Sequence, residues 1–441
     1  MFKFAHVADL HLDTPFSGLG SLDAAAAEKL RDASLAAWDN VVRDCIERDV
    51  AFVVIAGDVY DGLDAGVRAQ IRFLRGLERL SAVGIECFLV HGNHDPAGSL
   101  RALVGRWPER VHVFSCGRVE ERVVERDGRV LAVVSGVSYR DQHVTDNLAL
   151  GFARSELDAF HVGVLHCSVG DHPEHGRYAP CSLDDLVAAR LDYWALGHIH
   201  ARRVLREANP VVAYSGNTQG RHPKEEGAKG FLVVTVDDSR AASLEFVPTD
   251  LWRFASLEVD VSGIATLPEL EERLAQLARE ATAGAGGRGL VLRARLSGRG
   301  PLHASLARRG TLDGLLEHLR DEARSGGEDL WWDAVEDATR PALDRERLAA
   351  GDDFVADLIA TADAWRAGPE ARLARALEGL RGHAAVRRAL DALGPDALAL
   401  DAAAILEEAE ALALDRLEVG AAPDRREVAA APDRQEAGGA A

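Results

Sequence analysis

Short apolar runs alternate with amphipathic stretches over roughly the first 250 residues of the chain. Residues 50–56 (VAFVVIA) are apolar without interruption, which is typical of a strand buried on both faces of a sheet. The segments on either side, 24–49 and 66–83, carry apolar residues at helical spacing. This alternation of strand and helix predicts α/β crossover units that contain parallel strands.

A strand-rich portion follows the crossover units. Asp127-Gly128 lies between two apolar runs, which predicts a β-hairpin. The strands expected along the chain are 2–8, 50–56, 85–90, 111–115, 120–125, 130–134, 162–165, 193–196, 211–214, 231–236 and 244–247.

The pattern changes near Thr249. A strand at 257–261, a helix at 267–282 and a strand at 290–296 predict a small β-α-β unit. Beyond it the chain is mostly helical, and residues 396–418 show the clearest helical spacing. The tail lacks an apolar period, so we expect it to be disordered. The expected domains are an α/β domain (1–250), the small β-α-β unit (251–300), a helical region (301–419) and the tail (420–441).

Length, composition and charge exclude several classes of protein. The 441 residues predict more than one domain, and no apolar run is long enough to span a membrane. With 71 acidic and 51 basic residues the net charge is −20, which argues against gripping nucleic acid by overall charge. The five cysteines have no C-x-x-C spacing, so a disulfide framework or zinc finger is not expected. The start has no signal-peptide layout, and a cytoplasmic protein is expected.

Five polar stretches each follow an expected strand. They are Asp9-Leu10-His11, Gly57-Asp58-Val59-Tyr60-Asp61, Gly92-Asn93-His94-Asp95, His166 and Gly197-His198-Ile199-His200. Ligands of open α/β sheets bind beyond the carboxyl ends of the strands, so we expect one shared site. A lone histidine or a single Asp-x-His is more often a cap or a surface residue. Five such stretches in this order are hard to obtain from caps.

The residue types at these positions indicate a metal site. Carboxylates, an amide and imidazoles without a thiolate suit Mn²⁺, Fe²⁺ or Zn²⁺. The seven candidate ligands are too many for one ion: Asp9, His11, Asp58, Asn93, His166, His198 and His200. Two ions roughly 3.5–4 Å apart and bridged by one carboxylate would use them all. This arrangement activates a hydroxide nucleophile for the hydrolysis of phosphate esters.

The order of these motifs resembles the calcineurin-like metallophosphoesterase superfamily. Within it, the chain is similar to bacterial DNA-repair exonucleases of the SbcD and YhaO type. Residues 2–13 (FKFAHVADLHLD) and 215–222 (SGNTQGRH) carry this closer likeness, which covers roughly residues 1–250. The resemblance implies an α/β fold in which a β-sandwich is flanked by helices, and then a β-α-β capping unit and a helical C-terminal region. Bacterial members commonly have aspartate at the position of Asp61, where other relatives often have histidine.

The resemblance also implies a role for each site residue. One ion would be held by Asp9, His11, Asp58 and His200, and the other by Asp58, Asn93, His166 and His198. His94 would stabilise or protonate the leaving oxygen, with Asp61 and Asp95 as orienting groups. Mn²⁺ is the expected ion, with Fe²⁺, Zn²⁺ and Mg²⁺ as alternatives. DNA would be contacted by Arg221, His222 and Lys224, whose loop the resemblance places beside the active site.

Several features of the sequence are open to more than one interpretation. The arginines at 202, 203 and 206 either contact a phosphate backbone or are merely solvated. Trp331-Trp332 is interpreted as core or interdomain packing. The helix in 396–418 either packs within its domain or binds a partner.

Three functions are compatible with the sequence. The leading one is a metal-dependent DNA exonuclease or endonuclease in DNA repair. The alternatives are a phosphoesterase acting on a small molecule or phosphoprotein, and a structural subunit with vestigial chemistry. The resemblance implies a coiled-coil ATPase partner of the SbcC type, bound through the C-terminal helices, and allows a homodimer. The chain has no Walker A motif, so any ATP-driven step needs such a partner.

Overall fold

The computed structural model describes residues 1–14, 16–17, 29–62, 66–97, 107–170, 176–327, 329–369, 371–372, 375 and 402–417. The chain divides into two compact units, and neither is continuous in sequence. The first contains residues 1–259, 271–295 and 312–336, and the second contains residues 260–270, 296–311 and 337–441. None of the helices in the described ranges has the length and apolar character needed to cross a membrane.

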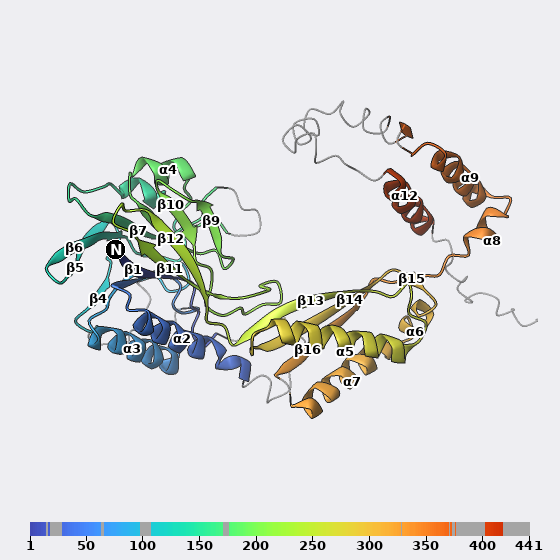
Figure 1. The fold of residues 1–441 in the computed structure, drawn as a ribbon, viewed down its shortest axis with the longest axis horizontal. Coiled ribbons are helices and arrows are strands. Elements are labelled where there is room, and N and C mark those ends of the chain that lie inside the picture. The colour runs from blue at the N-terminus through green and yellow to red at the C-terminus, as the bar shows by residue number, and fades with distance from the viewer. Residues whose placement is uncertain are drawn as a thin grey trace, which may run out of the picture. The chain divides into compact units, whose positions relative to one another are not determined.

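The first unit contains a six-stranded sheet of order β12-β11-β1-β2-β3-β4 (Figure 1). Its strands are β1 (Phe2–Val7), β2 (Phe52–Ala56), β3 (Glu86–Val90), β4 (Val111–Val113), β11 (Gly230–Val236) and β12 (Ala242–Pro248). Strands β1 to β4 are parallel, whereas β11 pairs antiparallel with both β1 and β12. The carboxyl ends of β1, β2 and β3 therefore lie at one edge.

A second six-stranded sheet of the same unit has the order β5-β6-β7-β8-β10-β9. Its strands are β5 (Glu120–Arg126), β6 (Arg129–Gly136), β7 (Phe160–His166), β8 (Tyr193–Gly197), β9 (Arg203–Arg206) and β10 (Val211–Tyr214). Strands β6, β7, β8 and β10 are parallel. The hairpin expected at Asp127-Gly128 joins β5 to β6, and β9 pairs antiparallel with β10.

Apolar side chains of both sheets meet in a shared core. Phe4 of β1 stacks on Phe52 of β2 with ring centroids 4.8 Å apart, and Tyr193 of β8 meets Phe4 edge-on at 5.2 Å. Helices α2 (Ala33–Glu47) and α3 (Val67–Ala82) pack on the other face of the first sheet. The 3-10 turn η1 (Leu148–Gly151) and helix α4 (Leu183–Ala188) pack on the other face of the second. The predicted β-sandwich flanked by helices is confirmed.

A three-stranded sheet of order β13-β14-β16 follows the sandwich along the chain. Its elements are β13 (Trp252–Asp260), α5 (Leu267–Gly284), β14 (Gly289–Ser297), α7 (Thr311–Gly326) and β16 (Leu330–Asp337). The first three are the expected β-α-β unit, whereas strand β16 was not expected. Trp331 and Trp332 of β16 are both buried, and Trp331 packs in a cluster with Trp252 and Phe254.

The second unit contains the helical C-terminal region. Its remaining elements are β15 (Arg299–Gly300), α6 (His303–Leu306), β17 (Arg340–Pro341), α8 (Arg345–Ala349), α9 (Phe354–Arg366) and α12 (Ala402–Arg416). The buried carboxylate of Glu410 on α12 pairs with Arg345 of α8, at 2.9 Å, and with Arg366 of α9. Residues 396–401 of the expected helix, and the tail at 420–441 expected to be disordered, lie outside the described residues.

Candidate metal centre

The five polar stretches follow five strands, which end at the same edge of the sandwich. Strands β1, β2 and β3 belong to the first sheet, and β7 and β8 belong to the second. The side chains at or just beyond their ends are Asp9, Asp58, Asn93, His166, His198 and His200. Both sheets end at the same place, so residues far apart in sequence become neighbours.

Asp9, His11 and His200 form a first group of donor atoms. One donor atom from each lies within 4.8 Å of the other two. His11 Nε2 is 3.1 Å from His200 Nε2, so the two rings face a common position. Asp9 and His11 have positive φ angles of 50° and 43°. Such angles are rare outside glycine, and they concentrate where a site constrains the backbone.

Asp58 connects this group to a second one. Asp9, Asp58 and His166 also place donor atoms within 4.8 Å of one another. Asp58 Oδ2 lies 3.3 Å from His166 Nε2 and 3.8 Å from His11 Nε2. Asn93 Oδ1 is 2.9 Å from His166 Nε2. Asp58 thus lies between a histidine of each group, which is the position that a bridging ligand needs.

The chemistry of these contacts fits cations. His166 Nδ1 is 2.9 Å from the carbonyl oxygen of Ala56, which fixes the ring proton on Nδ1. Nε2 then faces the Asn93 and Asp58 oxygens, which are acceptors, so a positive charge is favoured here: burial acts to lower the pKa of His166, but Asp58 raises it to about 9. A divalent cation resolves this convergence of acceptors. The donor set of oxygen and imidazole nitrogen suits Mn²⁺, Fe²⁺ or Zn²⁺.

The carboxylates of Asp9 and Asp58 are buried, and burying a negative charge costs free energy unless a positive charge lies nearby. Both Asp9 and Asp58 are only 1% exposed. Burial raises the pKa of Asp9 to about 6, although His166 and His200 act in the opposite direction. Burial also favours a raised pKa for Asp58, but His166 and His11 outweigh it and the net shift of the pKa is downward. Clustered carboxylates held in this way are typical of metal sites.

Glycines before the ligands allow the close approach of neighbouring loops. A Cβ atom at Gly92 would lie 2.2 Å from Asp58 Oδ1, and one at Gly197 would lie 1.9 Å from the carbonyl oxygen of Ala56. Any larger residue would therefore push the strand ends apart. This lack of space explains why glycine precedes Asn93 and His198.

Among the residues that the structure describes, His198 is a member of neither donor group. Its Nε2 is 3.1 Å from the carbonyl oxygen of Gly176, and its ring stands edge-on to His166 with centroids 5.4 Å apart. Its backbone N–H donates to Asp9 Oδ1 at 3.0 Å. His198 stays a predicted ligand, and its backbone already orients the Asp9 carboxylate.

A second polar group lies beside the donor atoms. His94 Nδ1 is 2.5 Å from Asp61 Oδ1, and Arg221 Nη1 donates to Asp61 Oδ2 at 2.9 Å. The hydrogen bond with Asp61 raises the pKa of His94, while burial acts to lower it. With the Nδ1 proton held by Asp61, Nε2 is available for a substrate oxygen. A nitrogen of His94 also lies within 4.8 Å of donor atoms of His11 and Asp61.

Asp95 holds two of the strand-end loops together. Its side chain accepts hydrogen bonds from the backbone N–H of Val59, at 2.9 Å, and of Gly92, at 2.8 Å. Asp95 is 1% exposed. It contacts backbone rather than metal ligands or substrate, so its action on the site is to orient the loops that carry Asp58 and Asn93.

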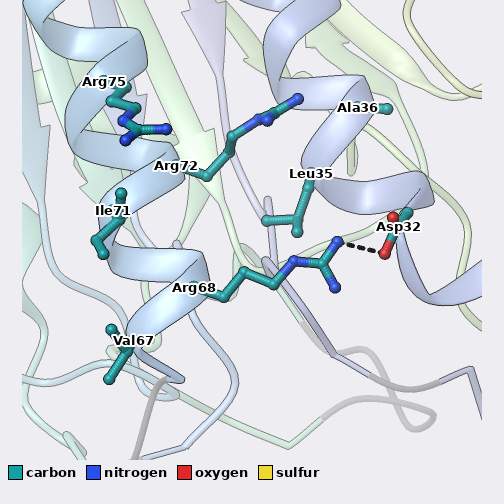
Figure 2. Close-up of a pocket in the computed structure, with 8 residues that line it drawn as sticks. All are labelled: Asp32, Leu35, Ala36, Val67, Arg68, Ile71, Arg72 and Arg75. Atoms are coloured by element: carbon teal, nitrogen blue, oxygen red, sulfur yellow. Dashed lines mark hydrogen bonds and ion pairs between the residues drawn. The ribbon is translucent and has the colours of Figure 1, made fainter.

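A groove of about 590 Å³ lies elsewhere, between α2 and α3 (Figure 2). Its lining is Asp32, Leu35, Ala36, Val67, Arg68, Ile71, Arg72 and Arg75. Figure 2 shows Arg68 reaching across the groove to an ion pair with Asp32. None of the candidate ligands lines this groove, so its size does not mark the active site.

Comparison with known families and proteins agrees with the geometry. Residues 2–202 match the calcineurin-like phosphoesterase family. The uncharacterized metallophosphoesterase YhaO of Bacillus subtilis is 33% identical over 392 residues, which cover 88% of this chain and 92% of that protein. The chain is a calcineurin-like metallophosphoesterase. Residues 254–340 of this metallophosphoesterase match the YhaO middle domain, so the closer likeness to the YhaO type is confirmed.

The metallophosphoesterase also matches proteins named DNA double-strand break repair protein Mre11. The one from Thermoplasma acidophilum is 25% identical over 223 residues, or 46% of this chain and 56% of that protein. The one from Haloferax volcanii is 28% identical over 287 residues, or 62% and 58%. A dimetal phosphatase structure from Danio rerio aligns over 54% of this chain and 93% of that one at 14% identity, with a TM-score of 0.31. That likeness is too slight to add an argument.

Membership of the family defines the general chemistry. Calcineurin-like metallophosphoesterases are phosphoester hydrolases that use two divalent metal ions, and the two donor groups, which share Asp9 and have Asp58 between their histidines, can hold them.

The residues predicted to contact DNA lie on one turn of the metallophosphoesterase. The side chain of Arg221 is 14% exposed and engaged with Asp61. His222 Nδ1 accepts from the backbone N–H of Lys224 at 3.0 Å, and Lys224 is exposed. Of the arginines after β8, Arg202 lies over the Phe246 ring, 4.6 Å from its centroid, and the others are exposed on β9. DNA contact by these residues stays a prediction.

The sequence analysis missed Glu225. Its Oε1 is 2.6 Å from His200 Nδ1, which makes it a direct partner of a candidate ligand. No strand-end position or motif spacing marks Glu225 in the sequence. The only signal was its place just after the SGNTQGRH stretch.

Proposed function

We propose that this metallophosphoesterase is a metal-dependent nuclease that hydrolyses DNA phosphodiester bonds, as an exonuclease or an endonuclease, in DNA repair. One observation carries the proposal. Two donor groups, which share Asp9 and have Asp58 between their histidines, lie beside the linked side chains of His94, Asp61 and Arg221. The first set binds cations, and the second supplies a proton donor and a positive charge for a phosphate group.

The donor groups define where two divalent ions would bind. One ion would be held by Asp9, His11, Asp58 and His200, and the other by Asp58, Asn93, His166 and His198. When bound, such ions neutralise charge on phosphoryl oxygens and lower the pKa of the attacking water. We propose Mn²⁺ as the ion, because carboxylate, amide and imidazole donors suit it.

The side chains of His94 and Arg221, beside the proposed ion sites, stabilise the leaving group. In its doubly protonated form, which the hydrogen bond of Nδ1 with Asp61 favours by raising the pKa of His94, His94 donates the Nε2 proton to the departing oxygen and keeps the proton on Nδ1. Arg221 shares the same carboxylate and brings a permanent positive charge next to it. A phosphate that approaches His94 therefore meets both groups at once.

Likeness to the Mre11 proteins supports DNA as the substrate. Their name associates them with repair of double-strand breaks, and the match to the Haloferax volcanii protein covers 62% of this chain. The turn at 222–224 continues from Arg221 and offers the exposed basic side chain of Lys224. The five cysteines are all free thiols, which suits a reducing cytoplasm.

We also propose that a coiled-coil ATPase of the SbcC type binds the helical C-terminal region. The chain is acidic overall and has no Walker A motif. A second subunit would supply both the grip on long DNA and the use of ATP.

The purified protein can be tested on linear duplex, single-stranded and hairpin DNA beside a generic phosphate diester, a phosphomonoester and a phosphopeptide. We expect DNA cleavage with Mn²⁺ and none with chelator. Cleavage of the small substrates without cleavage of any DNA would instead establish the alternative phosphoesterase.

Two variants separate metal binding from turnover. Asp58→Ala should lose the bridging oxygen and, with it, the pair of ions in metal analysis. His94→Ala should keep metal content and DNA binding but lose turnover by roughly 10²–10⁴-fold. If metal content falls in His94→Ala as it does in Asp58→Ala, His94 is a ligand, as its place near His11 and Asp61 also allows.

A further inference from the structure

Glu225 connects the metal centre to the loop that carries Arg221. Its Oε1 lies 2.6 Å from His200 Nδ1. Its Oε2 accepts from the backbone N–H of Arg221 at 2.6 Å and from Asn217 Nδ2 at 3.0 Å. Both oxygens of one carboxylate are therefore engaged, each with a different part of the site.

The contact with His200 determines which ring nitrogen is available to a metal ion. A carboxylate only accepts, so the proton of His200 is held on Nδ1 and the lone pair is left on Nε2. That Nε2 is the atom that lies 3.1 Å from His11 Nε2, at the first donor group. A carboxylate behind a histidine also makes the ring a better metal ligand.

The contacts with Arg221 and Asn217 fix the loop around the same carboxylate. The turn is closed by the Glu225 backbone N–H, which donates to the carbonyl oxygen of His222 at 2.8 Å. The Arg221 side chain then reaches Asp61 at 2.9 Å. The group that faces the phosphate and the histidine that faces the metal thus depend on one side chain.

The other donor group has a different support. The Nδ1 proton of His166 is held by the carbonyl oxygen of Ala56, which belongs to strand β2. Side-chain substitution cannot remove a backbone carbonyl. A change at Glu225 should therefore affect the ion bound by His200 and leave the ion bound by His166 in place.

We infer that Glu225 is a positioning residue, which orients His200 as an Nε2 ligand and at the same time holds Arg221 beside Asp61. The inference rests on the proposed pair of metal ions but not on DNA as the substrate. In this role Glu225 acts through His200 and Arg221, the two groups that its carboxylate contacts. Because one carboxylate holds both partners, binding of one ion is coupled to the placement of Arg221, the arginine proposed to bind phosphate.

Glu225→Gln tests this role with a side chain of the same size. Glutamine has one acceptor oxygen and one N–H₂ group, so it cannot accept on both sides at once. In Mn²⁺ calorimetry on the chelator-treated full-length variant, we expect one of two sites to weaken roughly 10–100-fold and the other to stay unchanged. Hydrolysis of a generic phosphate diester should fall, recover in kcat at raised Mn²⁺, and keep a raised KM because Arg221 remains displaced. Glu225→Asp, which keeps two acceptors on a shorter chain, should restore part of the lost affinity.

Two control variants separate positioning from a general effect on folding. Glu86→Gln changes a similar carboxylate–histidine pair, since Glu86 Oε2 is 3.1 Å from His112 Nε2, but at the first sheet away from the donor groups. Asn217→Ala loosens the same loop and leaves the Glu225 carboxylate on His200. Both should bind two Mn²⁺ ions as the unchanged protein does.

Equal Mn²⁺ affinity in Glu225→Gln and the unchanged protein would overturn the inference. So would a loss in Asn217→Ala as large as that in Glu225→Gln, because loop folding would then explain both. These readouts use metal and a generic diester. If the chain cleaves no DNA yet Glu225→Gln loses one ion, the nuclease proposal fails and the positioning role stands.

Discussion

Candidate ligands could be identified in the sequence because their motifs directly follow buried strands. Asp58 and His166 are examples, since each is at the end of an apolar run that could only be a strand. Glu225 could not be predicted in this way. It meets His200 through a turn and across 25 positions of sequence, and only the folded chain shows that contact.

His6 shows the opposite case, a buried histidine close in sequence to the site that is not a ligand. Its Nδ1 is 2.9 Å from Tyr193 Oη and its Nε2 is 3.1 Å from the carbonyl oxygen of Leu196. Burial lowers the pKa of His6 to about 3 from an ordinary 6.5, although the hydrogen bond to Leu196 acts to raise it. The ring is therefore neutral in the folded protein and packs as part of the core.

This shift of pKa predicts acid sensitivity. Between pH 6.5 and about 3 the unfolded chain holds a proton on His6 that the folded protein does not, so stability falls as the pH falls. His6→Gln removes the titration and keeps a donor for Leu196. Across this window the free energy of unfolding of the unchanged protein should fall faster than that of the variant, by at most about 1.4 kcal/mol per pH unit. Urea unfolding with chelator at several pH values measures both slopes, and parallel slopes would contradict the prediction.

At the scale of elements, the sequence predicted the strands whose cores are apolar and missed β9, β15, β16 and β17, of which β16 is the longest. Strand β16 has the sequence LWWDAVED, in which acidic residues interrupt the apolar pattern. Asp333 is nevertheless buried, because Arg293 of β14 donates to its Oδ2 at 2.5 Å. An ion pair with a neighbouring strand thus replaces the apolar contact that the pattern would have required.

Packing between α2 and α3 depends on a single glycine. A Cβ atom at Gly76 of α3 would lie 2.2 Å from Nε1 of the buried Trp38 on α2. At Gly314 of α7, by contrast, a Cβ atom would meet nothing within 4 Å. Helix propensity favours alanine at both positions, so the two sites differ mainly in the space around them.

Alanine substitution should therefore act in opposite directions. Gly314→Ala should stabilise the protein by roughly 0.5–1 kcal/mol through helix propensity alone. Gly76→Ala should destabilise it by about 1–3 kcal/mol, because overpacking against Trp38 exceeds that gain. Denaturant unfolding of both variants in the same buffer gives the two values. A stabilised Gly76→Ala variant would show that α2 and α3 can move apart at no cost.

For the whole molecule, the sequence predicted the order of parts, while their boundaries stay predictions. A boundary at residue 300 would separate β16 from β13 and β14, although all three belong to one sheet. The family match to residues 254–340 also extends past that point. We therefore propose that the capping unit ends near Pro341 and that the candidate dock for a partner begins after it.

Truncation after Pro341 tests this division. The shortened chain keeps β16 and the pairing of Gly300 with Pro341, and it loses α8, α9 and α12. We expect unchanged Mn²⁺ binding and unchanged hydrolysis of a generic phosphate diester, because the donor groups all lie before residue 201. Co-purification with a co-expressed coiled-coil ATPase should be lost, and degradation of long duplex should slow far more than that of short oligonucleotides.

Truncation after Gly300 provides the contrast. It removes β16, which pairs in the same sheet as β14, and with it Trp331 from the cluster around Trp252 and Phe254. That chain should lose stability in thermal unfolding, whereas the chain ending at Pro341 should not. If the chain ending at Pro341 still binds the ATPase, the dock lies on residues 251–341 and not on the C-terminal helices. If both truncated chains unfold at the temperature of the full chain, β16 is not an integral part of its sheet and the boundary near residue 300 is correct.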